Sequence, residues 1–243
     1  MSLSMEGKRM LVVSAHPGDV LWRCSGAVAK HVKLGGTATI IVVTYGTGGE
    51  ANELMKAGLT VAEAKALRKR DLTRSAEILG ADIEFWDMQD YRFEITQDKI
   101  MKLAQKIRDL RPSLILTHHG KDILNPDHGY MLEYVNMSLE VATGHGVPLD
   151  GAPADRAPIF CFEPHDSESN GFVPNLFVDI TDVIDIKKAA MATCELKAPL
   201  AETYVNRAKY RGQNAGSFGR KGCKYAEAYE AIYPIAEYGY FVW

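Results

Sequence analysis

The stretch RMLVVSAHPGD, residues 9–19, joins an apolar run to a short polar segment that carries an imidazole and a carboxylate. The apolar run predicts a buried strand, and His16 and Asp19 follow its carboxyl end three positions apart. Ligands bind outside the carboxyl ends of strands in open α/β sheets, so the stretch predicts both a first strand and a functional site. Gly18, between the two groups, has no side chain with which to do chemistry.

Strands and helices alternate through the first half of the chain. We predict strands at 9–14, 37–44, 82–86 and 113–117, and helices at 19–33, 60–79 and 97–110. Thr60 and Glu63 form a capping box for the second helix, and Gly80 is its C-cap. This repetition predicts an α/β fold: a Rossmann-like, doubly wound, mostly parallel sheet with helices on both faces.

The second half is less regular. It predicts helices at 131–142 and 182–194 and strands at 159–163 and 176–180. Without an internal repeat or a strong linker, residues 1–243 are expected to form a single domain, in which 195–243 are a C-terminal extension that folds over the site. Residues 1–4 look like a cloning remnant ahead of the natural start and carry no weight in the fold prediction.

Composition excludes several classes of function. The 243 residues carry a net charge of -3, whereas a sequence-independent nucleic-acid binder would be clearly basic. No apolar run approaches the roughly 20 residues that span a bilayer. The glycine-rich loop at 46–50 has neither of the phosphate-binding spacings. Cysteines occur at 24, 161, 194 and 223 without paired spacing, so we expect reduced thiols in a cytoplasmic protein, and neither a disulfide framework nor a thiolate zinc site.

The predicted strand at 113–117 also ends in polar chemistry, with THHGKD at 117–122 and NPDH at 125–128. If this strand neighbours the first one, His16, Asp19 and His128 can form a two-imidazole, one-carboxylate site for a divalent metal. Such a site leaves positions open for water and substrate, and the metal would polarise a substrate oxygen. From spacing alone, the alternative of hydrogen-bonded structural residues at strand ends stays open.

Several motifs resemble those of the PIG-L (LmbE-like) family, whose typical members are zinc-dependent N-deacetylases of amino sugars. HPGD at 16–19 is similar to the family's AHPDDE motif, and 44–50 match its Thr-x-Gly-x-x-Gly-Glu loop. Residues 68–80 match its R-x-x-E…LG helix, with Asp71 where Glu is usual, and 125–128 resemble its H-P-D-H motif. The resemblance implies that His16, Asp19 and His128 hold one zinc ion per chain.

The departures from the family pattern are as informative as the matches. Family deacetylases use the first Asp of the DD pair as general base, and that position is Gly18 here. They stabilise the oxyanion with the His that opens H-P-D-H, which is Asn125 here, and Val20 replaces the Glu of the first motif. Losing a general base typically costs about 10²–10⁴-fold in rate, and losing an oxyanion donor about 10²–10³-fold. Efficient amide hydrolysis by the family's usual route is therefore not expected.

One branch of the family, the 4-oxalomesaconate hydratases of bacterial aromatic catabolism, lacks the same base and adds water to a carbon–carbon double bond. The chain resembles this branch beyond the zinc motif. The matching segments are SAHxxD at 14–19, Trp22-Arg23, Lys121-Asp122, FEPH at 162–165, DIT at 179–181 and YAE at 225–227. We therefore predict a zinc-dependent hydratase that acts on a small, anionic, unsaturated oxo-dicarboxylic or tricarboxylic acid.

The resemblance and the chemistry together assign roles to further residues. The substrate carboxylates require cationic or N–H donors. The predicted substrate-binding residues are Arg23, Lys121, Asn125, Arg207 and Arg211. The predicted catalytic residues are Glu50, Asp127 and His165. A structural role in closing its loop is an alternative for Glu50, and a solvated surface position is one for each basic residue. One of His118 and His119 is expected to line the site.

Two other functions stay open. One is a deacetylase that has recruited Asp127, Glu50 or His165 as its base. The other is a catalytically idle family member that binds metal and ligand without turnover. Converging Arg and Lys side chains around the metal would favour an acidic substrate, whereas neutral donors and stacking aromatics would favour a sugar. A homo-oligomer is also expected, because family members are commonly oligomeric.

Overall fold

A seven-stranded sheet organises the computed structural model, which describes residues 4–91, 93–194 and 198–234. Among these residues the strand order is β3-β2-β1-β4-β5-β7-β6. The strands are β1 (Arg9–Ser14), β2 (Thr37–Val42), β3 (Asp82–Phe85), β4 (Leu114–His118), β5 (Ile159–Phe162), β6 (Leu176–Asp179) and β7 (Ala226–Ala231). β1 to β5 pair in parallel, and β7 is antiparallel to both of its neighbours. The predicted mostly parallel α/β sheet is confirmed.

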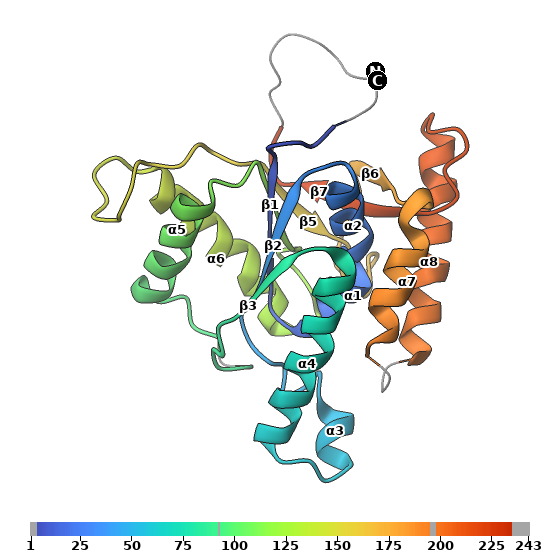
Figure 1. Ribbon diagram of the computed structural model, residues 1–243, viewed down its shortest axis with the longest axis horizontal. Coiled ribbons are helices and arrows are strands. Elements are labelled where there is room, and N and C mark those ends of the chain that lie inside the picture. The colour runs from blue at the N-terminus through green and yellow to red at the C-terminus, as the bar shows by residue number, and fades with distance from the viewer. Residues whose placement is uncertain (1–3, 92, 195–197, 235–243) are drawn as a thin grey trace.

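Helices cover both faces of this sheet, as predicted (Figure 1). One face carries α1 (Pro17–Arg23), α2 (Ser25–Lys33), α4 (Val61–Leu79), α7 (Ile184–Ala192) and α8 (Ala198–Ser217). The other carries α5 (Gln97–Leu110) and α6 (Pro126–Thr143), while α3 (Asn52–Lys56) packs against α4. The predicted capping box of α4 and its left-handed Gly80 cap are both present. No described helix combines the length and the apolar character needed to span a membrane.

The direction of strand addition reverses between β1 and β4. β2 and β3 lie on one side of β1, and β4 and β5 lie on the other. The register pairs Met10 with Leu114 and Val12 with Leu116, so both strands end at the same edge of the sheet. This is the topological switch point at which open α/β sheets place their ligands.

The predicted single helix at 19–33 is wrong, because α1 ends and α2 begins at Cys24. A buried ion pair from the C-terminal half stabilises this break. Lys187 Nζ donates to the carbonyl oxygen of Trp22 at 2.9 Å, at the end of α1. The Glu227 carboxylate accepts from the backbone N–H of Gly26 at 2.9 Å, in the first turn of α2. The positive Lys187 thus lies at the C-terminus of α1, where unpaired carbonyl groups favour a cation. The negative Glu227 lies at the N-terminus of α2, where unpaired N–H groups favour an anion.

The helix predicted at 131–142 begins earlier, at Pro126. Asn125 is its N-cap, and its Oδ1 accepts from the backbone N–H of Asp127 at 3.1 Å. Proline is well suited to the first helical position because its missing N–H would lack a helical partner there in any case. The earlier start places Asp127 and His128 in the first turn of the helix rather than in a loop.

Two elements of the C-terminal segment are absent from the sequence prediction. β7 lies inside the sheet between β5 and β6, so the segment predicted as a covering extension contributes to the core. Its sequence, AEAYEA, has little β propensity, and α8 contains Gly212 and Gly216, which weaken a helical pattern. Tertiary packing overrides both local preferences. The parts of the prediction that concern 1–3, 195–197 and 235–243 lie outside the described residues.

Candidate metal centre

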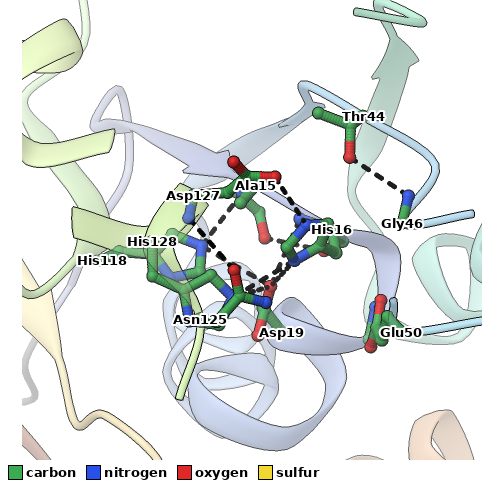
Figure 2. Close-up of polar contacts among 12 residues, drawn as sticks. Ala15, His16, Asp19, Thr44, Gly46, Glu50, His118, Asn125, Asp127 and His128 are labelled. Atoms are coloured by element: carbon green, nitrogen blue, oxygen red, sulfur yellow. Dashed lines mark hydrogen bonds and ion pairs between the residues drawn. The ribbon is translucent and has the colours of Figure 1, made fainter. Parts of the chain in front are cut away.

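Three side chains converge at the shared edge of β1 and β4 (Figure 2). His16 Nδ1 lies 3.2 Å from Asp19 Oδ2 and 3.1 Å from His128 Nε2, and His128 Nε2 lies 3.2 Å from Asp19 Oδ2. In a tetrahedral zinc site with ligand distances of about 2.0–2.1 Å, neighbouring ligand atoms lie about 3.3–3.5 Å apart. The three atoms therefore have the spacing and the chemistry of a candidate metal-binding triad, formed by the residues that the sequence analysis proposes.

Local structure explains why these atoms meet. His16 is the N-cap of α1, directly after β1, and Asp19 stands at the third helical position. The Asp19 carboxylate accepts from the backbone N–H of His16 at 3.2 Å, and the positive end of the helix dipole favours its charge. His128 reaches the same point from the first turn of α6. All three side chains are buried.

Two carboxylates orient the imidazoles from the other side of each ring. His16 Nε2 lies 2.9 Å from Asp90 Oδ1, and His128 Nδ1 lies 2.8 Å from Asp122 Oδ2. Each carboxylate accepts an N–H from its imidazole, so the opposite ring nitrogen keeps its lone pair for a metal. Burial alone would raise the pKa of Asp90 and Asp122, but the hydrogen bonds with His16 and His128 outweigh it and lower both to about 2.

The sequence analysis did not assign roles to Asp90 and Asp122. Both follow strands at the edge where the site forms: Asp122 lies four residues past the end of β4, and Asp90 lies five residues past the end of β3. Their position after parallel strands is the signal that could have identified them. Nothing local in the sequence says which imidazole each one would contact.

Arg23 lies behind the ligands, although the sequence analysis predicted a contact with substrate. Only 4% of the residue is exposed. The guanidinium donates from Nε to Asp19 Oδ1 at 3.1 Å, from Nη1 to the carbonyl oxygen of Glu163 at 3.0 Å, and from Nη2 to Asp122 at 3.4 Å. Burial would lower the pKa of Arg23, but the charge of Asp19 raises it overall. The geometry favours a role in orienting Asp19.

His118, the last residue of β4, packs against the candidate metal ligand His128. Its Nε2 accepts from the backbone N–H of Ala15 at 2.9 Å, and its ring centroid lies 4.1 Å from that of His128. Burial lowers the pKa of His118 well below the usual value, so the ring is neutral at pH 7. His119 is half-buried, and its Nδ1 accepts from the backbone N–H of Lys121 at 3.3 Å. Of the tandem pair, His118 is the one that contacts the metal-binding residues.

The carboxylate of Glu50 occupies the space beside Gly18. A Cβ at position 18 would lie 2.0 Å from Glu50 Oε1 and 2.8 Å from Trp22 Nε1. Glu50 Oε2 accepts from the backbone N–H of Gly18 at 3.4 Å and forms an ion pair with Arg68. The carboxylate of Glu50, from the loop after β2, therefore fills the space that a side chain at position 18 would take.

Asp127 lies next to Asp90, on the far side of the His16 ring from the three converging atoms. Its Oδ2 is 3.6 Å from His16 Nε2 and accepts from the backbone N–H of Tyr91 at 2.7 Å. Its side chain is buried. These contacts suit a residue that holds His16 better than a base that reaches substrate. Asn125 caps the same helix and lies beside the centre in Figure 2.

His165 approaches the centre from the loop after β5, with its ring centroid 6.1 Å from that of His128. Its Nδ1 lies 2.8 Å from the hydroxyl of Tyr204. Burial, followed by the positive charge of Arg23, lowers the pKa of His165 to about 4. The ring is therefore neutral at pH 7.

The other predicted substrate cations differ in exposure. Arg207 donates to the carbonyl oxygens of Pro164 at 2.9 Å and His165 at 2.7 Å, and Arg211 forms an ion pair with Glu163. Both arginines thus hold the loop that carries His165. Lys121 is exposed, three residues past the end of β4.

Comparison with known proteins agrees with this geometry. Residues 11–137 match the family model PIG-L, described as GlcNAc-PI de-N-acetylase. A 4-oxalmesaconate hydratase from Pseudomonas putida is 33% identical over 232 residues, which cover 93% of this chain and 90% of that protein. A diacetylchitobiose deacetylase from Thermococcus kodakarensis is 27% identical over 90% of this chain and 83% of that protein.

Solved structures show the same likeness. The 4-carboxy-2-hydroxymuconate hydratase from Pseudomonas putida KT2440 superposes with a TM-score of 0.91 at 32% identity, covering 96% of this chain and 100% of that one. The N,N'-diacetylchitobiose deacetylase from Pyrococcus horikoshii, at 19% identity and a TM-score of 0.76 over 93% of this chain and 84% of that one, shares the fold. The matched family model, the full-length relatives and the His16–Asp19–His128 centre together show that this chain belongs to the PIG-L family.

Proposed function

We propose that this protein is a zinc-dependent hydratase that adds water to a carbon–carbon double bond of a small unsaturated oxo-acid, such as 4-oxalomesaconate, in aromatic-compound catabolism. The observation that carries the proposal is the Glu50 carboxylate in the space beside Gly18. A side chain at 18 cannot serve as base there, so the usual deacetylase arrangement does not fit. Two relatives named as hydratases, each aligned over more than nine-tenths of this chain, support the same reaction.

Hydration needs no reactant besides water and the alkene. One O–H bond of water breaks, the hydroxyl bonds to one alkene carbon, and a proton bonds to the other. His16, Asp19 and His128 would hold the zinc ion, which when bound polarises a substrate oxygen and stabilises the charge that develops in the conjugated acid. Glu50 and the neutral ring of His165 are the groups we assign to proton transfer.

The alternative of an N-deacetylase draws support from the 27% identity with the Thermococcus enzyme. It requires a base other than residue 18. Asp127 is an unfavourable choice because it lies behind the His16 ring, which leaves Glu50 and His165. A catalytically idle protein is disfavoured by the same two groups, since a carboxylate and a neutral imidazole stand near the metal ligands.

The purified protein is expected to contain about one zinc ion per chain and to hydrate an oxalomesaconate-type acid, followed as loss of conjugated-alkene absorbance. Glu50→Gln should lower kcat by about 10²–10⁴-fold, because general acid–base assistance is typically worth that much. Zinc content should stay the same, since Glu50 is outside the His16–Asp19–His128 triad.

Glu53→Gln is the matched control, because Glu53 is an exposed residue on α3 that pairs with Lys56. It should leave kcat unchanged. Release of acetate from N-acetyl sugars without turnover of the unsaturated acid would overturn the hydratase proposal in favour of the deacetylase. Zinc binding with neither reaction would favour the idle protein.

We further propose that Lys121, an exposed cation three residues past the end of β4, binds a carboxylate of the substrate. Lys121→Ala is expected to raise KM about tenfold while changing kcat little, because an exposed charge acts mainly on binding. Lys8→Ala is the control, since Lys8 is exposed and precedes β1 at the opposite edge of the sheet. An unchanged KM in Lys121→Ala would remove Lys121 from the substrate site.

A further inference from the structure

We propose that Tyr204 is a positioning residue that fixes the ring of His165 and selects Nε2 as the nitrogen offered to substrate. The inference rests on the proposed function, in which His165 transfers a proton. It begins from one contact: the Tyr204 hydroxyl lies 2.8 Å from His165 Nδ1. Tyr204 belongs to α8, a helix that the sequence analysis did not predict.

One face of α8 binds three consecutive residues of the loop after β5. Tyr204, Arg207 and Arg211 are spaced three and four apart, so they lie on the same side of the helix. Arg211 pairs with the carboxylate of Glu163, and Arg207 donates to the carbonyl oxygens of the next two residues, including that of His165 at 2.7 Å. Tyr204 then contacts the His165 ring itself. The helix therefore holds both the backbone and the side chain of His165.

Two further side chains contact the Tyr204 ring. Trp22 of α1 stacks on it, with ring centroids 5.8 Å apart and an interplanar angle of 24°, and the Arg207 guanidinium carbon lies 5.1 Å from its centroid. Only 4% of Tyr204 is exposed. A phenol held in this way has little freedom to rotate, so its hydroxyl presents one fixed partner to the imidazole. Trp22 also lies three residues past the ligand Asp19, which links the position of Tyr204 to the metal-binding helix.

The contact decides which nitrogen of His165 can act. An imidazole has two ring nitrogens, and its hydrogen bond at one sets the protonation of the other. Because Nδ1 faces Tyr204, Nε2 is left on the opposite side of the ring, and no described residue forms a hydrogen bond with it. The centroid of the His165 ring lies 6.1 Å from that of His128, one of the candidate metal ligands. Nε2 is therefore the atom assigned to proton transfer.

Tyr204→Phe removes the hydroxyl and keeps the ring that stacks on Trp22. We expect kcat for hydration to fall about tenfold or more and KM to stay within about twofold. The pH dependence of kcat should also shift, because the hydroxyl stabilises one protonation state of His165 relative to the other. Tyr210→Phe is the matched control: Tyr210 is an exposed residue of the same helix, and its variant should match the unmodified protein. Equal kcat and equal pH profiles in Tyr204→Phe would overturn the proposal.

A second measurement does not depend on the reaction. Long-range ¹⁵N–¹H spectra of the zinc-loaded, histidine-labelled protein report the tautomer of each imidazole, and His165→Gln identifies the His165 signals. We expect one tautomer in the unmodified protein and a mixture or a switch in Tyr204→Phe. An unchanged tautomer would refute the role of Tyr204. If the spectra change as expected but neither protein hydrates the acid, the proposed function fails while the positioning of His165 by Tyr204 stands.

Discussion

Gly18→Asp is expected to lower hydratase activity by about 10²–10⁴-fold without creating deacetylase activity. On motif grounds alone this change restores the missing base of the deacetylases. In the structure, the first atom of the new side chain would lie 2.0 Å from Glu50 Oε1 and 2.8 Å from Trp22 Nε1. Glu50 must therefore leave its place, and its proton-transfer role is lost with it. Two carboxylates in one buried space also repel each other.

Gly18→Ala separates the steric effect from the charge, because a methyl group alone already meets Glu50. We expect it to lose most of the hydratase activity as well. Gly146→Asp is the control, since a Cβ at this exposed glycine has nothing within 4 Å. Hydration rates, acetate release and zinc content are measured on all three proteins. Acetate release by Gly18→Asp would show that residue 18 alone separates the two reactions, against the steric argument.

Glu227→Gln is expected to reduce the free energy of unfolding by about 3–5 kcal/mol, because it leaves the buried Lys187 ammonium without its counter-charge. The Lys187 side chain is 1% exposed, and its Nζ lies 2.6 Å from Glu227 Oε1. The Glu227 carboxylate also accepts from the backbone N–H of Ala27 at 2.7 Å and from the Tyr229 hydroxyl at 2.8 Å. Denaturant unfolding followed by circular dichroism measures the loss.

The exposed ion pair between Arg156 and Glu140 supplies the control. Both of its side chains are about half exposed, so Arg156→Ala should cost less than about 1 kcal/mol. The double variant Lys187→Met/Glu227→Gln should recover part of the loss, because it removes the uncompensated charge. Equal unfolding free energies for Glu227→Gln and Arg156→Ala would show that the buried pair does not hold the α1–α2 break.

The three candidate metal ligands were named from the sequence through the family resemblance, and local rules explain why two of them lie together. His16 and Asp19 are three residues apart at a strand end, where an N-cap and the third helical position face each other. Placing His128 beside them required one further assumption, that the strand preceding it in the chain neighbours the first strand. The pairing of β4 with β1 confirms this assumption. Hydrophobic periodicity located β1 to β6 with boundaries shifted by a few residues at most.

The contacts of the residues around those ligands could not be predicted from the sequence in the same way. Arg23 and Arg211 were predicted to bind substrate on the strength of their charge, yet each forms ion pairs inside the protein. Asp90 and Tyr204 contact His16 and His165 across 74 and 39 residues of sequence. A charge or a hydroxyl in a sequence shows what a residue can bond, whereas the partner depends on how distant elements pack.

Gly18 shows the division most clearly. The sequence by itself determined the α/β architecture and the lack of a base at position 18, and with the family resemblance it named the three candidate metal ligands, because strand periodicity, helix capping and motif spacing act over a few residues. Only the tertiary structure decided that the loop after β2 places Glu50 in the vacant space, that Arg23 faces Asp19, and that α8 holds His165. These contacts join segments far apart in the chain, and the packing that brings them together depends on the whole fold.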